Sequence, residues 1–278
     1  MEQILLPSKI EYTAGDAPNQ TIVTIEPLYP GYGTTIGTAL RRVLLSSLSG
    51  GAVVAVKIKG VQHEFSTIPY VQEDVVDIIL NIKKLRFKVH TDETVRLLLQ
   101  VKGEKDVTGA DIQSSNDAEV ANPDCKICTL TNKNAQLEME VFVKRGRGYW
   151  PTEMREKEKL EIGTIAIDAL YTSIRSVGLN VENVRVGQMT NYNKVVLTIE
   201  TDGSITGEEA MREASSILLD HFKVFATGES DMPNEEATDE LEAPDVISGT
   251  LNEDGDASDE DEDTEDAPKK RGRPKKGA

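Results

Sequence analysis

The pattern of apolar and polar positions predicts a helix over residues 33–48, around which the rest of the chain is organised. At 100° per residue, one wide arc of this helix holds small and medium-sized residues: Ala39, Val43, Ile36, Ser47, Leu40, Leu44 and Leu48. The opposite side carries Arg41, Arg42 and Leu45. Two interpretations remain open: a surface helix with a solvated basic face, or a helix with its own core on one side and another protein on the other.

Local residues also predict how this helix begins, ends and packs. A hydroxyl of Thr34 or Thr35 can accept a hydrogen bond from the free N–H groups of the first turn. The segment Ser49-Gly50-Gly51 is expected to stop the helix. The small residues of the apolar arc suit close packing against another helix.

Two further segments have helical periodicity. Residues 71–83 are apolar at i, i+4, i+7, i+8 and i+11, which predicts an amphipathic helix with Glu73 and Asp74 in its first turn. A capping box, Thr206-Gly207-Glu208-Glu209, opens a third helix. Its stripe is expected to pack against the helix at 33–48 and comprises Ala210, Ala214, Ile217, Leu218, His221 and Phe225.

Alternation and β-branched residues predict strands elsewhere. The expected strands are 9–13, 21–26, 52–59, 61–65, 85–90, 94–102, 125–130, 135–144, 165–169, 184–188 and 195–200. Residues 103–123 and 152–161 are polar or highly charged and are expected to be irregular loops. Aromatic residues make up only 5% of the chain, so the core is expected to be aliphatic.

The net charge of −17 is distributed unevenly along the 278 residues. Residues 229–266 hold eighteen Asp and Glu and no Lys or Arg, and residues 269–276 hold six Lys and Arg. Residues 1–228 therefore carry only −5, which is ordinary for a globular unit. The acidic segment has few large apolar residues and is expected to be disordered.

The first residues contain no basic region followed by a long apolar run, and no apolar run approaches the ~20 residues that span a bilayer. We therefore expect a cytoplasmic protein. Cys125 and Cys128 form one C-x-x-C without the second pair of a zinc ribbon, and they are interpreted as strand residues. The three histidines are scattered, so no metal site is predicted.

Enzymatic chemistry finds no support in the sequence. The segment GYGTTIG (31–37) lacks the Lys-Ser/Thr of a phosphate-binding loop, and its glycines are interpreted as turn residues. The paired carboxylates of Glu73 and Asp74 have no nucleophile or metal-ligand cluster beside them. We expect no catalytic residue, no cofactor and no metal.

Residues 144–151, KRGRGYWP, form a basic and aromatic cluster. Glycines beside arginines and aromatic rings can bind single-stranded nucleic acid. A strand that ends in a protein-contact loop is the alternative, and the sequence favours it.

Several long motifs resemble one family. The segment PGYGTTIGTALRRVLLSSLSGGAV (30–53) is similar to the dimerisation helix of the bacterial RNA polymerase alpha subunit. The resemblance continues, in the family's order, through residues 60–85, 128–151 and 193–218, and it covers roughly residues 1–228.

The resemblance implies an α+β fold with two domains. A dimerisation domain, 1–50 and 174–228, would contain an antiparallel sheet and two long helices, and a mostly-β domain, 51–173, would be inserted in it and contact the large subunits. The protein would be a non-catalytic homodimer that scaffolds the beta and beta-prime subunits of a DNA-directed RNA polymerase, a nucleotidyltransferase complex that performs transcription.

The resemblance also implies site residues. The expected beta-subunit contacts are Arg42, Leu45, Asp77, Lys83 and Ile167. The expected dimer interface comprises Ile36, Leu40, Val43, Leu44, Ala214, Ile217, Leu218 and His221.

The chain departs from the family after residue 228, where we expect the usual helical C-terminal domain to be lacking. Residues 267–278 instead resemble an AT-hook, in which Arg271 and Arg273 would lie in the DNA minor groove with Gly272 and Pro274 keeping the backbone extended. A solubilising basic end is the plainer interpretation. The alternative function is an AT-hook DNA-architectural protein independent of polymerase.

Overall fold

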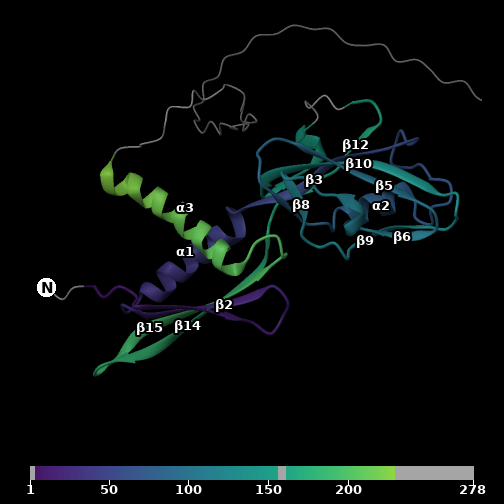
Figure 1. The fold of residues 1–278 in the computed structure, drawn as a ribbon. Coiled ribbons are helices and arrows are strands. Elements are labelled where there is room, and N and C mark those ends of the chain that lie inside the picture. Colours follow the sequence, from purple (N-terminus) through teal and green to yellow (C-terminus); the bar gives the residue numbers. More distant parts are fainter. Residues whose placement is uncertain (1–3, 156–160, 229–278) are drawn as a thin grey trace, which may run out of the picture. The chain divides into compact units, whose positions relative to one another are not determined.

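The computed structural model describes residues 4–155 and 161–228. This part of the chain is mostly β and contains three α-helices, at Tyr32–Ser46 (α1), Val75–Ile82 (α2) and Gly207–Thr227 (α3) (Figure 1). The expected acidic segment 229–266 and the AT-hook-like end 267–278 lie outside the described residues.

One antiparallel sheet has the strand order β1-β2-β15-β14. Its strands span Lys9–Ala14 (β1), Gln20–Leu28 (β2), Ile174–Val186 (β14) and Met189–Thr201 (β15). The central pair joins segments that are distant in sequence, because β2 aligns with β15 with Val23 opposite Leu197. Helices α1 and α3 lie on the same side of this sheet (Figure 1). Their apolar faces and the sheet enclose a first core, which includes the fully buried Leu44 and Ala214.

A second sheet has the strand order β7-β5-β10-β3-β4-β8, with β12 paired to β3. Its strands span Ser49–Ile58 (β3), Phe87–Val89 (β4), Val95–Lys102 (β5), Ile112–Gln113 (β7), Ala118–Val120 (β8), Gln136–Arg147 (β10) and Thr164–Ala166 (β12). Two small sheets join Lys105–Thr108 (β6) to Lys126–Leu130 (β9), and Tyr149–Trp150 (β11) to Ala169–Leu170 (β13). Short 3₁₀ turns occupy Gly109–Asp111 and Thr152–Arg155.

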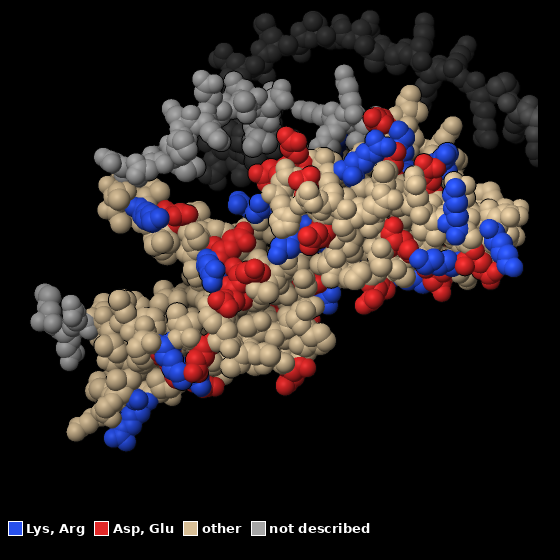
Figure 2. All heavy atoms as spheres, in the orientation of Figure 1, with Lys and Arg blue, Asp and Glu red and all other residues tan. Residues whose placement is uncertain are grey.

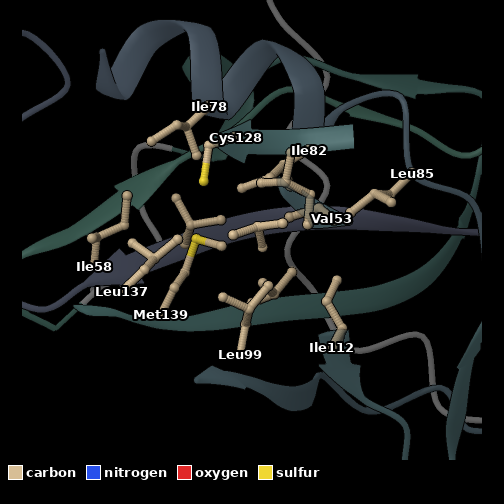
Figure 3. Packing of buried hydrophobic residues seen from close by; sticks show 14 of the residues in the cluster. Val53, Ile58, Ile78, Ile82, Leu85, Leu99, Ile112, Cys128, Leu137 and Met139 are labelled. Carbon is tan, nitrogen blue, oxygen red and sulfur yellow. The ribbon is translucent and has the colours of Figure 1, made fainter. Parts of the chain in front are cut away.

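Helix α2 closes the second core. Ile78 and Ile82 point from the helix toward Cys128 on β9 and toward the sheet below, where Val53 and Met139 lie (Figure 3). The side chains are almost all aliphatic, as the low aromatic content predicts. Alternate residues of β10 are buried, which is the period-two pattern of a strand with one face on a core.

The segment expected to stop the first helix begins a strand instead. Helix α1 ends at Ser46, and β3 starts at Ser49. The glycines there have a packing reason: a Cβ on Gly50 would lie 2.0 Å from the carbonyl oxygen of Tyr171, and one on Gly51 would lie 2.6 Å from that of Phe87. Two neighbouring backbones therefore approach too closely for any side chain.

The second helix is shorter than expected. It begins at Val75, capped by the Asp74 carboxylate, which accepts a hydrogen bond from the Asp77 N–H at 2.8 Å. Val71 forms an isolated bridge with Leu130 instead. Glu73 is outside the helix, because its carboxylate accepts the N–H of Thr129 at 2.7 Å. These contacts with β9 are non-local, so the periodicity of the segment could not reveal them.

Predictions for three parts of the chain, two of strands and one of a loop, need correction. Residues 61–65 form turns rather than a strand, with Phe65 79% exposed. Residues 103–123 contain three short strands and a 3₁₀ turn, because tertiary pairing orders a polar sequence. Strands β14 and β15 are much longer than 184–188 and 195–200, since they pair with each other along their whole length.

The two cores share no residue. By contacts, however, both sheets belong to one compact unit, Met1–Asp231. The division into domains at 1–50, 51–173 and 174–228 therefore stays a prediction. Helix α1 has 15 residues and α3 has 21, and their part in a dimer is also a prediction.

Candidate protein interface

Helix α1 rests on the sheet through a stripe of glycines. Gly33 and Gly37 are both buried, and a Cβ on Gly37 would lie 2.6 Å from Cδ1 of Leu179 on β14. A Cβ on Gly33 would lie 2.8 Å from Cβ of Asn193 on β15. The small residues of the helix thus allow close approach to strands, whereas the sequence suggested only another helix.

The start of α1 is not capped by Thr34 or Thr35. The N-cap is Gly31, whose φ of 89° lies in the left-handed region and which has no side chain to cap with. Asn193 caps the helix instead, because its Oδ1 accepts the Gly31 N–H at 2.8 Å and the Gly33 N–H at 3.3 Å. The two threonines are exposed. A residue 160 positions away cannot be recognised as a cap from local sequence.

The other side of α1 is open to solvent. Arg41 and Arg42 are exposed, and Leu45 is 39% exposed. Within residues 4–155 and 161–228 neither arginine forms an ion pair. An uncommitted guanidinium beside an exposed leucine is a composition typical of protein interfaces.

Helix α3 begins with the capping box that the sequence predicts. Thr206 Oγ1 accepts the Glu209 N–H at 3.2 Å, and the Glu209 carboxylate accepts the Thr206 N–H at 3.0 Å. The first half of α3 buries Ala210 and Ala214 in the first core. From residue 219 onward the helix is exposed on all sides. Its large apolar side chains there are Leu219, Phe222, Val224 and Phe225, which are 55%, 59%, 41% and 82% exposed.

The expected dimer-interface residues fall into two groups. Leu40, Leu44 and Ala214 are at most 5% exposed because they fill this chain's own core. They are therefore not available to a second copy, and periodicity alone could not separate them from surface residues. Ile36, Val43, Ile217 and Leu218 are half-buried at the edge of that core, and His221 is exposed.

The other predicted beta-subunit contacts also differ in how exposed they are. Asp77 is exposed, and Lys83 is half-buried, donating to the Asp168 carboxylate at 3.2 Å. Ile167 is only 2% exposed and packs in the second core, so its side chain cannot contact a partner. Leu80, which helical periodicity places with Val76 and Lys83 in a mixed patch suited to a partner, is 50% exposed on α2.

A basic hollow of about 350 Å³ lies beside Lys83. Its charged lining comprises Lys83, Lys84, Arg86, Arg175 and Asp168. The N–H of Thr152, followed by the ammonium of Lys83, holds the pKa of Asp168 below its usual range. Asp168 is therefore ionised at neutral pH, but the four cationic side chains outnumber it, so the hollow is positive and suits an acidic partner surface. Arg175 is separated from the other lysines and arginines by almost ninety residues, so no local charge pattern could have indicated this site.

The cysteine pair has no features of a redox or metal site. Cys128 is buried on β9, and burial, followed by the charge of Glu73, raises the pKa of its thiol to about 12. A thiol in that state is a poor nucleophile and a poor ligand. Among the described residues, no three His, Cys, Asp or Glu side chains form a group that could hold a metal ion.

The basic and aromatic cluster at 144–151 lies at a strand end, since β10 runs to Arg147 and β11 follows. Arg145 is partly committed within the chain, because its Nη2 donates to Ser49 Oγ at 2.9 Å. Trp150 is 47% exposed and lines a hollow of about 240 Å³ together with Lys144 and Arg155.

On the face of the molecule shown in Figure 2, Lys and Arg side chains are interspersed with Asp and Glu. That face has no broad basic field of the kind that tracks a nucleic-acid backbone. No helix in the described ranges is long and apolar enough to cross a bilayer.

One comparison with known proteins bears on these surfaces. Residues 56–172 match the model of a protein family described as the RNA polymerase Rpb3/RpoA insert domain. The matched segment contains helix α2, Lys83 of the basic hollow and the second sheet except for most of β3. This part of the chain is thus similar to an RNA polymerase subunit domain, and the match indicates that the protein is part of an RNA polymerase assembly.

Proposed function

We propose that this chain is the non-catalytic alpha subunit of a bacterial RNA polymerase, whose homodimer scaffolds the beta and beta-prime subunits for DNA-templated transcription. The observation that carries this proposal is the match of residues 56–172 to the insert domain of RNA polymerase subunits. In this role the chain performs no chemistry of its own, and nucleotide addition belongs to the large subunits in the cytoplasm.

Helix α1 supplies the main contact with the beta subunit in this proposal. Its glycine stripe faces the sheet, while Arg42 and Leu45 are accessible. Arg42 lies nine residues after Gly33, which places it about 180° around the helix from the glycine stripe that contacts the sheet. A side chain in that position can be desolvated by a partner without disturbing the helix.

Helix α2 and the basic hollow supply a second contact. Asp77 and Leu80 are exposed on α2, and Lys83 at its end borders the hollow. Because Ile167 is buried, we replace it in this proposal by its neighbour Asp168, which is half-buried and pairs with Lys83.

The homodimer is supported by the exposed end of α3. Two phenylalanines there, Phe222 and Phe225, expose more than half of their surface, and an aromatic patch of this kind is costly to leave in water. We assign the dimer interface to this end together with Ile36, Val43, Ile217, Leu218 and His221. The proposed interface has no direct contact with the buried residues Leu40, Leu44 and Ala214, which pack beneath it in the first core.

Assembly with the large subunits tests the proposal. A tagged beta subunit from the same organism should retain the wild-type chain in stoichiometric amounts, and Arg42→Ala should abolish retention while the chain still dimerises. Arg212→Ala, which removes an exposed arginine on α3, is the matched control and should assemble normally. Normal assembly of Arg42→Ala would show that the assignment of Arg42 is wrong.

The same experiment separates the main proposal from the alternative. A polymerase subunit purifies with two very large chains, whereas an independent DNA-architectural protein does not. We further propose that residues 267–278 contact A·T-rich minor grooves through Arg271 and Arg273. A peptide of residues 265–278 should bind an A·T duplex more tightly than a G·C duplex, and equal affinities would exclude the AT-hook.

A further inference from the structure

The side chain of Asn193 joins the start of α1 to strand β15. Its Oδ1 accepts two backbone N–H groups, from Gly31 at 2.8 Å and from Gly33 at 3.3 Å. These are two of the N–H groups that a helix start leaves without an intrahelical partner. Gly31 itself has no side chain, so the helix depends on Asn193 for this cap.

The orientation of the Asn193 amide is fixed by its surroundings. Its Nδ2 donates to Oδ1 of Asn183 at 3.2 Å, and Asn183 lies opposite it on β14. The two backbone N–H groups can only donate, so they decide which end of the amide faces the helix, and Asn183 accepts from the other end. The pairing of β15 with β2 shifts register just after Asn193, and Asn193 is only 9% exposed.

A second contact clamps the same end of the helix. Tyr192, the preceding residue on β15, packs edge-on against Tyr29 with ring centroids 6.2 Å apart. Tyr29 packs in turn against Tyr32, the first residue of α1, at 6.0 Å. Two consecutive residues of β15 thus hold the segment that leads into the helix.

Fixing the first turn fixes the direction of the exposed face. Gly33 touches the hairpin of β14 and β15, and Arg42 lies about 180° away around the helix. If the first turn loosens, α1 is held only by its later turns, where Leu40 and Leu44 pack in the core, and its tilt and rotation on the sheet can change. The guanidinium of Arg42 then leaves the position that a partner surface requires.

We infer that Asn193 is a positioning residue for partner binding: it holds α1 in the one rotation that presents Arg42 and Leu45 to the large subunit. This inference rests on the proposed role of α1 in assembly. It adds a residue that contacts no partner and that lies on the β-hairpin rather than on the interface helix.

The test compares three full-length variants. Asn193→Ala removes the acceptor, whereas Asn193→Asp keeps an acceptor at the same place, since Asn183 can turn its amide to donate. Thr206→Ala is the control, because it removes the cap of α3, which carries none of the proposed beta contacts. Thermal unfolding, sedimentation and affinity for the purified beta subunit are measured well below the melting temperature of every variant. Hydrogen exchange of the peptide 29–45 reports on α1 without any partner.

Asn193→Ala is expected to remain folded and dimeric, to lose protection in residues 29–45, and to bind the beta subunit at least tenfold more weakly. Asn193→Asp should restore both protection and affinity, and Thr206→Ala should bind as wild type although its melting temperature falls. Wild-type affinity of Asn193→Ala, or equal loss in Thr206→Ala, would overturn the inference. Failure of the wild-type chain to bind the beta subunit would instead overturn the proposed function, while the hydrogen-exchange result would still test the cap.

Discussion

Helices α1 and α3 share one core, yet their starts are built in different ways. The cap of α3 comes from its own first turn, where Thr206 and Glu209 satisfy each other's N–H groups. The cap of α1 comes from Asn193 on a distant strand. A local cap stabilises the helix that carries it, whereas a remote cap also ties the helix to the sheet. The difference matches their proposed tasks, since α1 must present a defined face and α3 must offer an apolar end.

The largest expected difference between the two helices is the loss of unfolding free energy when a leucine of each is replaced by alanine. Leu44 on α1 is fully buried, and Leu219 on α3 is 55% exposed. Leu44→Ala should lower the free energy of unfolding by about 2–5 kcal/mol, because it removes buried methyl groups and leaves a cavity. Leu219→Ala, the same chemical change, should lower it by less than about 1 kcal/mol. Urea unfolding at a concentration where the chain is monomeric measures both values, and similar losses would contradict the assigned faces.

The exposed end of α3 should control association rather than folding. Phe222→Ser and Phe225→Ser should each weaken the dimer roughly thirtyfold to a thousandfold, since an aromatic anchor at an interface contributes about 2–4 kcal/mol. Sedimentation equilibrium measures the dimer dissociation constant. Phe65→Ser is the matched control, because Phe65 is at least about as exposed as the two α3 phenylalanines but lies in a turn outside the proposed interface. An equal effect of Phe65→Ser would mean that general surface hydrophobicity drives association.

Substituting one threonine at the start of each helix sharpens the comparison of the caps. Thr206→Ala should lower the free energy of unfolding by about 1 kcal/mol, because it deletes a hydrogen-bonded N-cap. Thr34→Ala, at the position where sequence predicted a cap for α1, should change it by only a few tenths of a kcal/mol, since Thr34 is exposed and Asn193 supplies the cap. Denaturant unfolding of both variants gives the values. A loss of about 1 kcal/mol at Thr34 would show that α1 is capped locally after all.

What could be predicted from sequence follows the same division between local and distant causes. The capping box of α3, the basic face of α1 and the amphipathic part of α2 were all readable, because their signals lie within a few residues. The cap of α1, the short start of α2 and the extension of the predicted strand 52–59 back to Ser49 depend on contacts with remote segments. Periodicity contains no information about such contacts.

At the candidate interface, the sequence did not predict which residues are accessible to a partner. Periodicity places Leu40 and Leu44 on the apolar arc of α1 and Leu45 on the arginine side, but only the fold shows that the first two pack in this chain's own core and not against a second copy. Ile167 looked like a strand residue of either face, and tertiary packing turned it inward. Arg175, at the start of β14 in the first sheet, joins the basic hollow only because the fold brings it beside Ala52 and Val53 of β3. Residue type was therefore predictable at the site, whereas accessibility was not.

The smallest expected effect is the response of the two helix starts to low pH. The N–H and hydroxyl of Thr206 hold the pKa of Glu209 below its usual value of 4.5, so the ionised carboxylate is favoured in the folded chain. The resulting stabilisation is present above the unfolded pKa and is lost as pH falls through the lower folded pKa. The first turn of α3 should therefore lose amide protection as the pH falls below about 4.5, after correction for intrinsic exchange rates. The start of α1 should not, since the Asn193 amide does not titrate.

Hydrogen exchange of the peptides 203–212 and 29–45 measures both, and Glu209→Gln should make the first peptide insensitive to pH. Equal acid sensitivity at the two starts would mean that the caps are not chemically distinct.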